Sequence, residues 1–199
     1  MFITFEGPEG CGKSTQIRFA EKWFRKRGRK VVSFREPGGT LTAEAIREVL
    51  LNHDAPLSSV VETFLFFAAR RDLVEKKILP ALKSGKIVLC DRFQDSTWVY
   101  QTCAGNFPKP LFVKAGAVAS QGLRPNLTFV FDVPVQVGLL RAGKKDRMER
   151  KSVQFHEKVR CGYLELARRE KKRCVLIPSV DGIEQVQREV EKVLERVFK

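Results

Sequence analysis

Five short apolar runs, separated by segments of helix length, constrain the fold of this chain more than any other feature. The runs are residues 2–5, 30–34, 86–90, 127–131 and 174–177. Each is nearly continuous rather than alternating with polar residues, which is typical of parallel strands covered on both faces. The rhythm of strands and helices therefore predicts an α/β fold with a five-stranded parallel sheet, flanked by helices and joined by right-handed crossovers.

The predicted helices have recognisable ends and faces. Residues 14–27 form the first, closed by Gly28 as a C-terminal cap, and residues 42–51 and 57–82 form the next two. Six apolar residues fall on one face of a last helix, namely Ile183, Val186, Val190, Val193, Leu194 and Val197.

Length and composition limit the class of protein. A chain of 199 residues with 43% hydrophobic content suits a single domain, residues 1–199, with a sizeable core. The first residues are already strand-like, which leaves no room for a signal peptide, and no apolar run approaches the ~20 residues of a membrane span. We therefore expect a cytoplasmic protein that does not enter a membrane.

The net charge of +14 permits two kinds of anionic partner, nucleic acid and a polyanionic small molecule. The basic residues are spread along the chain rather than gathered into one stripe. This distribution favours a generally basic, solvated surface over a nucleic-acid interface.

A glycine-rich segment after the first strand predicts phosphate binding. Gly7-x-x-x-x-Gly12-Lys13-Ser14 is the Walker A pattern, and it lies between a strand and a helix as that pattern requires. Its backbone N–H groups and the helix N-terminus form an anion nest, Lys13 reaches the β- and γ-phosphates, and the Ser14 hydroxyl coordinates Mg²⁺. The predicted ATP-binding residues are Gly7, Pro8, Glu9, Gly10, Cys11, Gly12, Lys13, Ser14 and Thr15. Cys11 is either a reactive thiol or a small residue that fills the turn.

A second motif follows the strand at residues 86–90. Asp91 is placed where parallel sheets bind ligands, and it could orient Mg²⁺ or its waters. Arg92 beside it could clamp a second phosphate. The alternative is a helix-capping Asp with a surface Arg.

Six segments together point to one family. They are FEGPEGCGKSTQ at 5–16, REPGGT at 35–40, FLFFAAR at 64–70, DRF-x-x-ST-x-x-YQ at 91–101, RPNLT at 124–128 and FH-x-x-VR-x-GY at 155–163. With these segments the chain resembles the thymidylate kinase family along nearly its whole length. The resemblance implies the three-layer P-loop nucleoside monophosphate kinase fold, transfer of phosphate from ATP to dTMP with Mg²⁺, and a homodimer packed through helices, with which the apolar character of residues 60–69 is compatible.

The resemblance also implies roles for individual residues. Phe66 matches the aromatic residue that stacks on thymine, and Arg70, one helical turn later, matches the arginine that donates to its carbonyl edge. Arg92 matches the clamp on the dTMP phosphate. The other implied dTMP contacts are Arg35 and Arg47 near that phosphate, Ser96, Thr97 and Gln101 beside the base, Tyr100 against the sugar 2′ position, and Glu9, with Glu36 as the weaker candidate, near the 3′-hydroxyl and the metal.

The chemistry implied by the resemblance needs several cations and no general base, because the acceptor is an ionised phosphate. The predicted catalytic residues are Lys13, Asp91 and Arg92, with Ser14 and Asp91 as Mg²⁺ ligands. Residues 8–11 hold no basic side chain, so a further cation is expected from a short lid at about residues 140–151, where Arg141 and Arg147 are the candidates. A basic surface turn is the alternative for this segment.

Two other functions of the chain remain open. One is a nucleoside monophosphate kinase with a broader acceptor range, and the other is a basic P-loop ATPase that binds nucleic acid.

Overall fold

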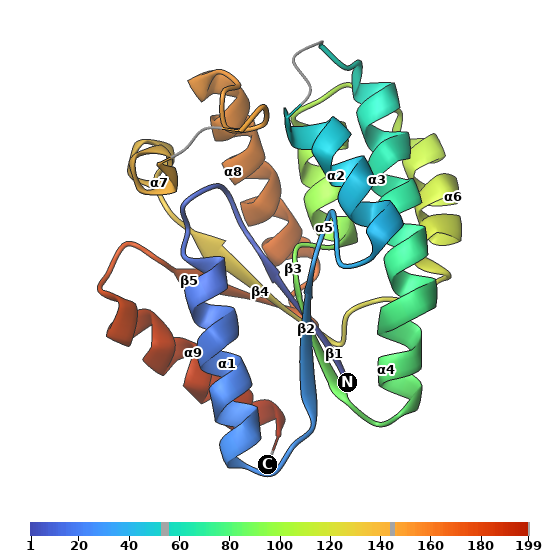
Figure 1. The fold of residues 1–199 in the computed structure, drawn as a ribbon. Helices are drawn as coiled ribbons and strands as arrows, with labels where there is room; N and C mark the ends of the chain where they lie inside the picture. The colour runs from blue at the N-terminus through green and yellow to red at the C-terminus, as the bar shows by residue number, and fades with distance from the viewer. Residues whose placement is uncertain (53–55, 144–145, 199) are drawn as a thin grey trace.

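Five parallel strands form one sheet at the centre of the molecule, in a computed structural model that describes residues 1–52, 56–143 and 146–198. The strands are β1 (Phe2–Glu6), β2 (Val31–Arg35), β3 (Ile87–Asp91), β4 (Leu127–Asp132) and β5 (Cys174–Pro178). Their order is β2-β3-β1-β4-β5, so the chain crosses over to both sides of β1 (Figure 1). The predicted α/β fold and its five strands are confirmed, each strand to within one residue at either end.

Helices cover both faces of the sheet and complete three layers (Figure 1). On one face, α1 (Lys13–Lys26) and α9 (Ile183–Val197) pack side by side over a core that includes Phe5, Phe129 and Phe131. On the other face, α8 (Val153–Arg169) covers β4 and β5, while the long helical run at residues 59–83 covers β3. Both faces of the strands are buried, which explains why their apolar runs are continuous.

The predicted helix at 57–82 is one continuous run with a wider turn inside it. It consists of α3 (Ser59–Leu73), the π-helical turn η1 (Val74–Ile78) and α4 (Leu79–Lys83). The run begins at Ser58, whose Oγ accepts a hydrogen bond from the Val61 N–H at 3.3 Å. The π turn ends at Ile78, two residues before Pro80, which has no N–H to donate to the preceding turn.

The other predicted helices also agree with the structure, apart from the exposure of two residues on the last one. Gly28, at φ 71°, follows α1 as the predicted cap, and α2 (Leu41–Asn52) matches residues 42–51. On α9, Val186, Val190, Val193 and Leu194 are buried as predicted. Ile183 and Val197, by contrast, are the first and last residues of this helix and are 60% and 41% exposed.

The remaining helices were not predicted. They are α5 (Gln94–Thr97), the π-helical η2 (Trp98–Cys103), α6 (Lys109–Ser120), α7 (Val135–Ala142) and α8. None of the described helices is both long enough and apolar enough to cross a membrane.

Candidate functional site

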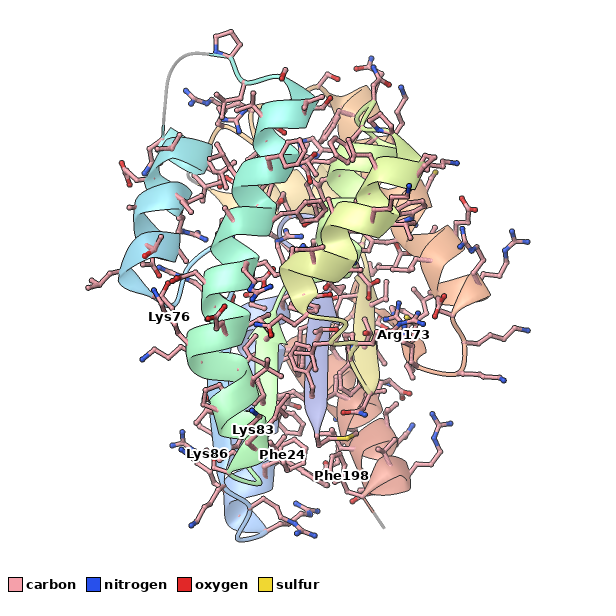
Figure 2. All side chains as sticks on the ribbon, turned by 90° about the vertical axis from the view of Figure 1, so that its right-hand side faces the viewer. Phe24, Lys76, Lys83, Lys86, Arg173 and Phe198 are labelled. Atoms are coloured by element: carbon pink, nitrogen blue, oxygen red, sulfur yellow. The ribbon has the colours of Figure 1, made fainter. Side chains whose placement is uncertain are left out.

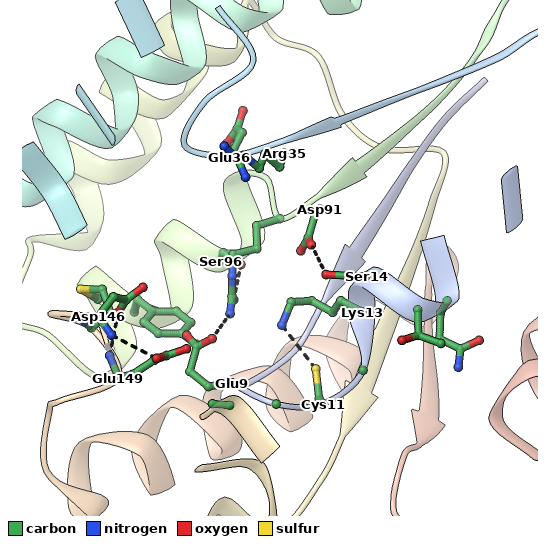
Figure 3. Close-up of a pocket in the computed structure, with 18 of the residues that line it drawn as sticks. Glu9, Cys11, Lys13, Ser14, Arg35, Glu36, Asp91, Ser96, Asp146 and Glu149 are labelled. Atoms are coloured by element: carbon green, nitrogen blue, oxygen red, sulfur yellow. Dashed lines mark hydrogen bonds and ion pairs between the residues drawn. The ribbon is translucent and has the colours of Figure 1, made fainter. Parts of the chain in front are cut away.

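A cavity of about 680 Å³ opens beside the carboxyl ends of β1 and β3. There the P-loop, which is the Walker A segment at residues 7–14, leads into α1 (Figure 3). It brings together most of the predicted site residues. These are Glu9, Gly10, Cys11, Gly12, Lys13, Ser14, Thr15, Arg35, Glu36, Arg47, Phe66, Arg70, Asp91, Arg92, Ser96, Thr97, Tyr100, Gln101 and Arg141. Gly7, Pro8 and Arg147 lie outside its lining. The clustering agrees with the rule that parallel sheets bind ligands at the carboxyl ends of their strands.

The P-loop holds its lysine over the turn. Lys13 is buried, and its Nζ donates to the carbonyl oxygens of Pro8 at 3.0 Å and Gly7 at 3.3 Å. Gly7 has a φ of 143°, and a Cβ at this position would lie 2.5 Å from the Phe131 carbonyl oxygen. Only glycine therefore allows the loop to lie this close to β4. Gly7 and Pro8 thus act through their carbonyl groups rather than by facing the cavity.

Cys11 fills the inside of this turn. Its side chain is fully buried, and its Sγ lies 3.4 Å from Lys13 Nζ. Burial raises the pKa of the Cys11 thiol, although the nearby charges of Lys13 and Arg92 oppose the shift. Of the two sequence interpretations, the small filling residue fits this environment and the reactive thiolate does not.

Two oxygen-bearing side chains meet at the first turn of α1. The Ser14 hydroxyl donates to Asp91 Oδ2 at 3.2 Å, a contact drawn as a dashed line in Figure 3. A hydroxyl and a carboxylate beside a phosphate nest are ligands of the type that Mg²⁺ takes when phosphate oxygens complete its coordination. The residues present therefore fit the predicted metal.

Arg92 enters the cavity from an unusual backbone conformation. Its φ is 66°, which is uncommon for a residue other than glycine. The guanidinium donates to Glu9 Oε2 at 2.8 Å, to the Gly7 carbonyl oxygen at 3.0 Å and to the Tyr163 hydroxyl at 3.1 Å. Burial opposes ionisation of Glu9, but the charges of Arg92 and Lys13 prevail and lower its pKa below the ordinary value.

On α3, Arg70 carries a buried donor with no partner in the part of the chain that the structure describes. Arg70 is 1% exposed. Both its Nε, at 2.8 Å, and its Nη2 donate to Glu36 Oε2. Nη2 also donates to Thr97 Oγ1 at 2.8 Å. Its Nη1 is buried and has no hydrogen-bond partner among the described residues. Because unpaired buried donors are rare, this atom is a candidate contact for a ligand in the cavity.

Arg35 and Arg47 both reach the cavity from the segment around β2 and α2. Arg35 pairs with Glu44 at 3.2 Å, and Arg47 Nη1 donates to the Pro37 carbonyl oxygen at 2.8 Å. Burial and the neighbouring charge of Arg35 lower the pKa of Arg47. A bound anion would offset both effects and stabilise the charged form of the Arg47 guanidinium.

The predicted lid is described in part, because Lys144 and Lys145 lie outside the described residues. Arg141 lines the cavity and donates to the carbonyl oxygens of Ser179 at 2.8 Å and Val180 at 3.1 Å. The structure places Arg147 elsewhere. Its guanidinium donates to the Leu50 carbonyl oxygen at 2.8 Å and to Glu62 at 2.5 Å, outside the cavity lining.

Comparison with known proteins decides the family. A family model described as thymidylate kinase matches residues 5–190. The chain belongs to the thymidylate kinase family. It is 49% identical over 182 residues to a thymidylate kinase of Caulobacter vibrioides, covering 89% of this chain and 88% of the relative. It is 41% identical over 197 residues to one of Thermoanaerobacter sp., covering 98% and 97%.

A solved structure of this family has the same architecture. The crystal structure of a thymidylate kinase from Ehrlichia chaffeensis matches with a TM-score of 0.82 at 34% identity, covering 98% of both chains. The P-loop nucleoside monophosphate kinase fold expected from the sequence motifs is therefore confirmed.

Several residues of the site in this thymidylate kinase family member were missed from the sequence. Glu6 at the end of β1 accepts hydrogen bonds from the Phe93 N–H at 2.8 Å and from the Ser96 hydroxyl, and Ser96 contacts Tyr163. The segment at 179–183 also lines the cavity, and Ser179 Oγ ties it to the Cys11 carbonyl oxygen at 2.6 Å. A carboxylate at the end of a largely apolar strand was the available signal for Glu6, whereas nothing in the pattern marked Ser179.

Glu6 is expected to make stability depend on pH. Burial and the charge of Asp95 raise its pKa from the ordinary 4.5 to about 8. The stability this group contributes is therefore fully present below pH ~4.5 and is lost as the pH rises through about 8. In Glu6→Gln, an amide replaces the protonated acid, and we expect a stability gain relative to wild type on the order of 3 kcal/mol at pH 9 that shrinks toward pH 5. Urea unfolding across this range measures it, and parallel curves for the two proteins would contradict it. Glu165→Gln, an exposed position, is the control.

Proposed function

We propose that this chain transfers the terminal phosphoryl group of ATP to dTMP and forms ADP and dTDP. The observation that carries the proposal is a single cavity lined both by the P-loop with Lys13 and by Phe66 and Arg70, whose Nη1 has no partner among the described residues. The first set suits a nucleoside triphosphate, and the second suits a base with a carbonyl edge. Membership of the thymidylate kinase family supports both halves.

The proposed mechanism relies on positioning and charge. Because the dTMP phosphate is already ionised near neutral pH, no residue has to remove a proton from it. Lys13 exchanges its loop carbonyl partners for phosphate oxygens of ATP, while Arg92 holds the acceptor phosphate from the other side. Both cations are largely withdrawn from water, which strengthens their interaction with the charge of the transferring group.

We further propose Ser14 and Asp91 as the residues that hold Mg²⁺, through their oxygen atoms and directly or through water. When bound, the metal ion neutralises charge on the phosphates of ATP. The 3.2 Å contact between the two side chains supports this role, because it keeps both oxygens beside the P-loop.

The sugar and base of dTMP are assigned to the α3 and α5 side. Phe66 stacks on the base, Arg70 Nη1 donates to its carbonyl oxygen, and Thr97 and Gln101 lie along the same wall. Tyr100 donates to Glu9 Oε1 at 2.7 Å, which holds the Tyr100 ring against the sugar, where it disfavours a 2′-hydroxyl. Ser96, Arg35, Arg47 and Glu36 complete the proposed dTMP contacts.

The additional cation is assigned to Arg141 in preference to Arg147. Arg141 already lines the cavity, and its guanidinium is held by two backbone carbonyl groups. Arg147 has to leave its ion pair with Glu62 before it can reach a phosphate. A catalytic role for Arg147 therefore stays a prediction that requires a different arrangement of the lid.

A homodimer through α3 and α6 is the proposed assembly. Val61, Phe64 and Ala68 form an exposed stripe on α3, and Leu111 and Val118 continue it on α6. Figure 2 shows the two helices side by side, facing the viewer. Exposed apolar faces of this kind are typical of subunit contacts. The cytoplasmic location remains a prediction.

Val118→Glu is expected to convert the dimer to a monomer, because it places a charge on this apolar face. Val113 is the matched control, since it lies on the opposite side of the same helix and is 63% exposed against 66% for Val118. Size-exclusion chromatography with light scattering gives the mass of each protein. A monomeric wild type, or equal behaviour of Val118→Glu and Val113→Glu, would contradict the proposed interface.

The proposed reaction is tested by ADP release in a coupled assay with ATP and Mg²⁺. The acceptors to compare are dTMP, dUMP, dCMP, dGMP, dAMP and UMP. Strongest turnover with dTMP supports the proposal, and comparable turnover with several acceptors would instead indicate a broad nucleoside monophosphate kinase. ADP release that depends on no acceptor would indicate an ATPase, and stimulation by DNA would then be tested.

A further inference from the structure

Glu62 on α3 is a buried carboxylate to which the proposed mechanism assigns no role. It is 2% exposed, and three donors surround it. Oε1 accepts from Arg147 Nη1 at 2.5 Å and from Lys151 Nζ at 3.4 Å, while Oε2 accepts from Gln101 Nε2 at 3.2 Å. One carboxylate therefore joins two lid cations to a residue that lines the cavity.

The contact with Glu62 fixes which end of the Gln101 amide remains for a ligand. A side-chain amide has a donor end and an acceptor end, whereas an ionised carboxylate only accepts. The Gln101 Nε2 is committed to Glu62. Glu62 forms ion pairs with Arg147 and Lys151, so reversing the amide would turn its oxygen toward a carboxylate oxygen. The group that Gln101 offers to the cavity is consequently the acceptor Oε1.

Gln101 lines the same cavity as Arg70, whose Nη1 has no partner among the described residues. Thr97 connects them, because its Oγ1 accepts from Arg70 Nη2 at 2.8 Å and it precedes Gln101 by one helical turn. A donor beside an acceptor complements a base edge with a carbonyl oxygen next to a ring N–H. Thymine and uracil have that edge. Cytosine has an amino group next to an unprotonated ring nitrogen, which is the reverse pattern.

We propose that Glu62 is a specificity-determining positioning residue, which holds the Gln101 amide in the orientation that accepts a hydrogen bond from the ring N–H of thymine or uracil. The proposal rests on the proposed function, since it concerns the base of the same acceptor. Glu62 acts through Gln101 and does not itself touch the nucleotide.

Glu62→Gln tests this with almost no change of shape. Arg147 and Lys151 can only donate, so they donate to the oxygen of the new amide. Its NH₂ group then faces Gln101. Gln101 then accepts with Oε1 and presents Nε2 to the cavity, which opposes the ring N–H and suits the cytosine nitrogen. We expect the ratio of kcat/KM for dTMP to that for dCMP to fall by about 10- to 100-fold. The ratio of kcat/KM for dUMP to that for dCMP should fall by a similar factor.

The control is Glu75→Gln, the same chemical change at an exposed position of the same helical run, where the ratio should stay unchanged. Should Glu62→Gln alone prove too unstable, the double variant with Lys151→Met restores the net charge around position 62 and keeps Arg147 in place. An equal loss for all three acceptors, or an unchanged ratio, would overturn the inference by showing a structural role only. A wild type that phosphorylates neither dTMP nor dUMP would overturn the proposed function, and the inference with it.

Discussion

Replacing Arg92 with methionine is expected to lower kcat/KM for dTMP by about 10³-fold while changing the KM for ATP little. The Arg92 side chain lines the cavity, is only 17% exposed, and has a backbone φ of 66°. The loss should be carried mainly by kcat, because the charge on the transferring phosphate is greatest in the transition state. Steady-state kinetics with each substrate varied in turn measures both parameters.

Two further variants separate this loss from a general effect of charge or folding. Arg92→Lys keeps a cation beside Glu9 but loses the fork geometry, and we expect a loss of about 10- to 100-fold. Arg124→Met removes a largely exposed arginine and should leave activity unchanged. An Arg92→Met enzyme within tenfold of wild type would contradict the assignment of Arg92 as the phosphate clamp.

Gly138→Ala is expected to lower kcat/KM by about 10²-fold, although alanine favours helices more than glycine does. Gly138 lies in α7, and a Cβ there would be 2.4 Å from the Glu9 carbonyl oxygen. A Cβ on Gly10 would in turn lie 1.9 Å from the Gly138 carbonyl oxygen. The two glycines thus let α7 and the P-loop touch backbone to backbone, and an added methyl group has to push the loop out of position.

The matched control for Gly138→Ala is Gln136→Ala, an exposed position two residues earlier in α7. Kinetics with ATP varied and thermal melting of both variants measure the effect. A fully active Gly138→Ala enzyme would show that α7 can withdraw from the P-loop without moving it, which would contradict the account of this contact.

The strands and the P-loop could be predicted from the sequence because each depends on residues that are close together in the chain. The apolar runs set the strands, and the 7–14 segment carries its own turn and helix start. Family resemblance supplied the candidate residues of the cavity, and the structure brings most of them to one place.

The exceptions depend on contacts between distant segments. The sequence shows neither that Arg70 is held by Glu36, 34 residues away, nor that Nη1 of Arg70 has no partner among residues 1–52, 56–143 and 146–198. The pairing of Arg147 with Glu62 joins residues 85 positions apart, and it removes a predicted lid cation from the cavity in this arrangement. Ile183 likewise lies at the cavity and is exposed, which the helical pattern of α9 does not encode.

Transfer of the γ-phosphoryl group from ATP to dTMP can be tested most directly with a labelled phosphate. The protein is incubated with Mg²⁺, dTMP and ATP labelled at the γ-phosphate, and the labelled products are separated by chromatography. Transfer of the phosphoryl group to dTMP moves the label to dTDP, in an amount equal to the ADP formed. Label that appears as inorganic phosphate, with dTMP unchanged, would contradict it.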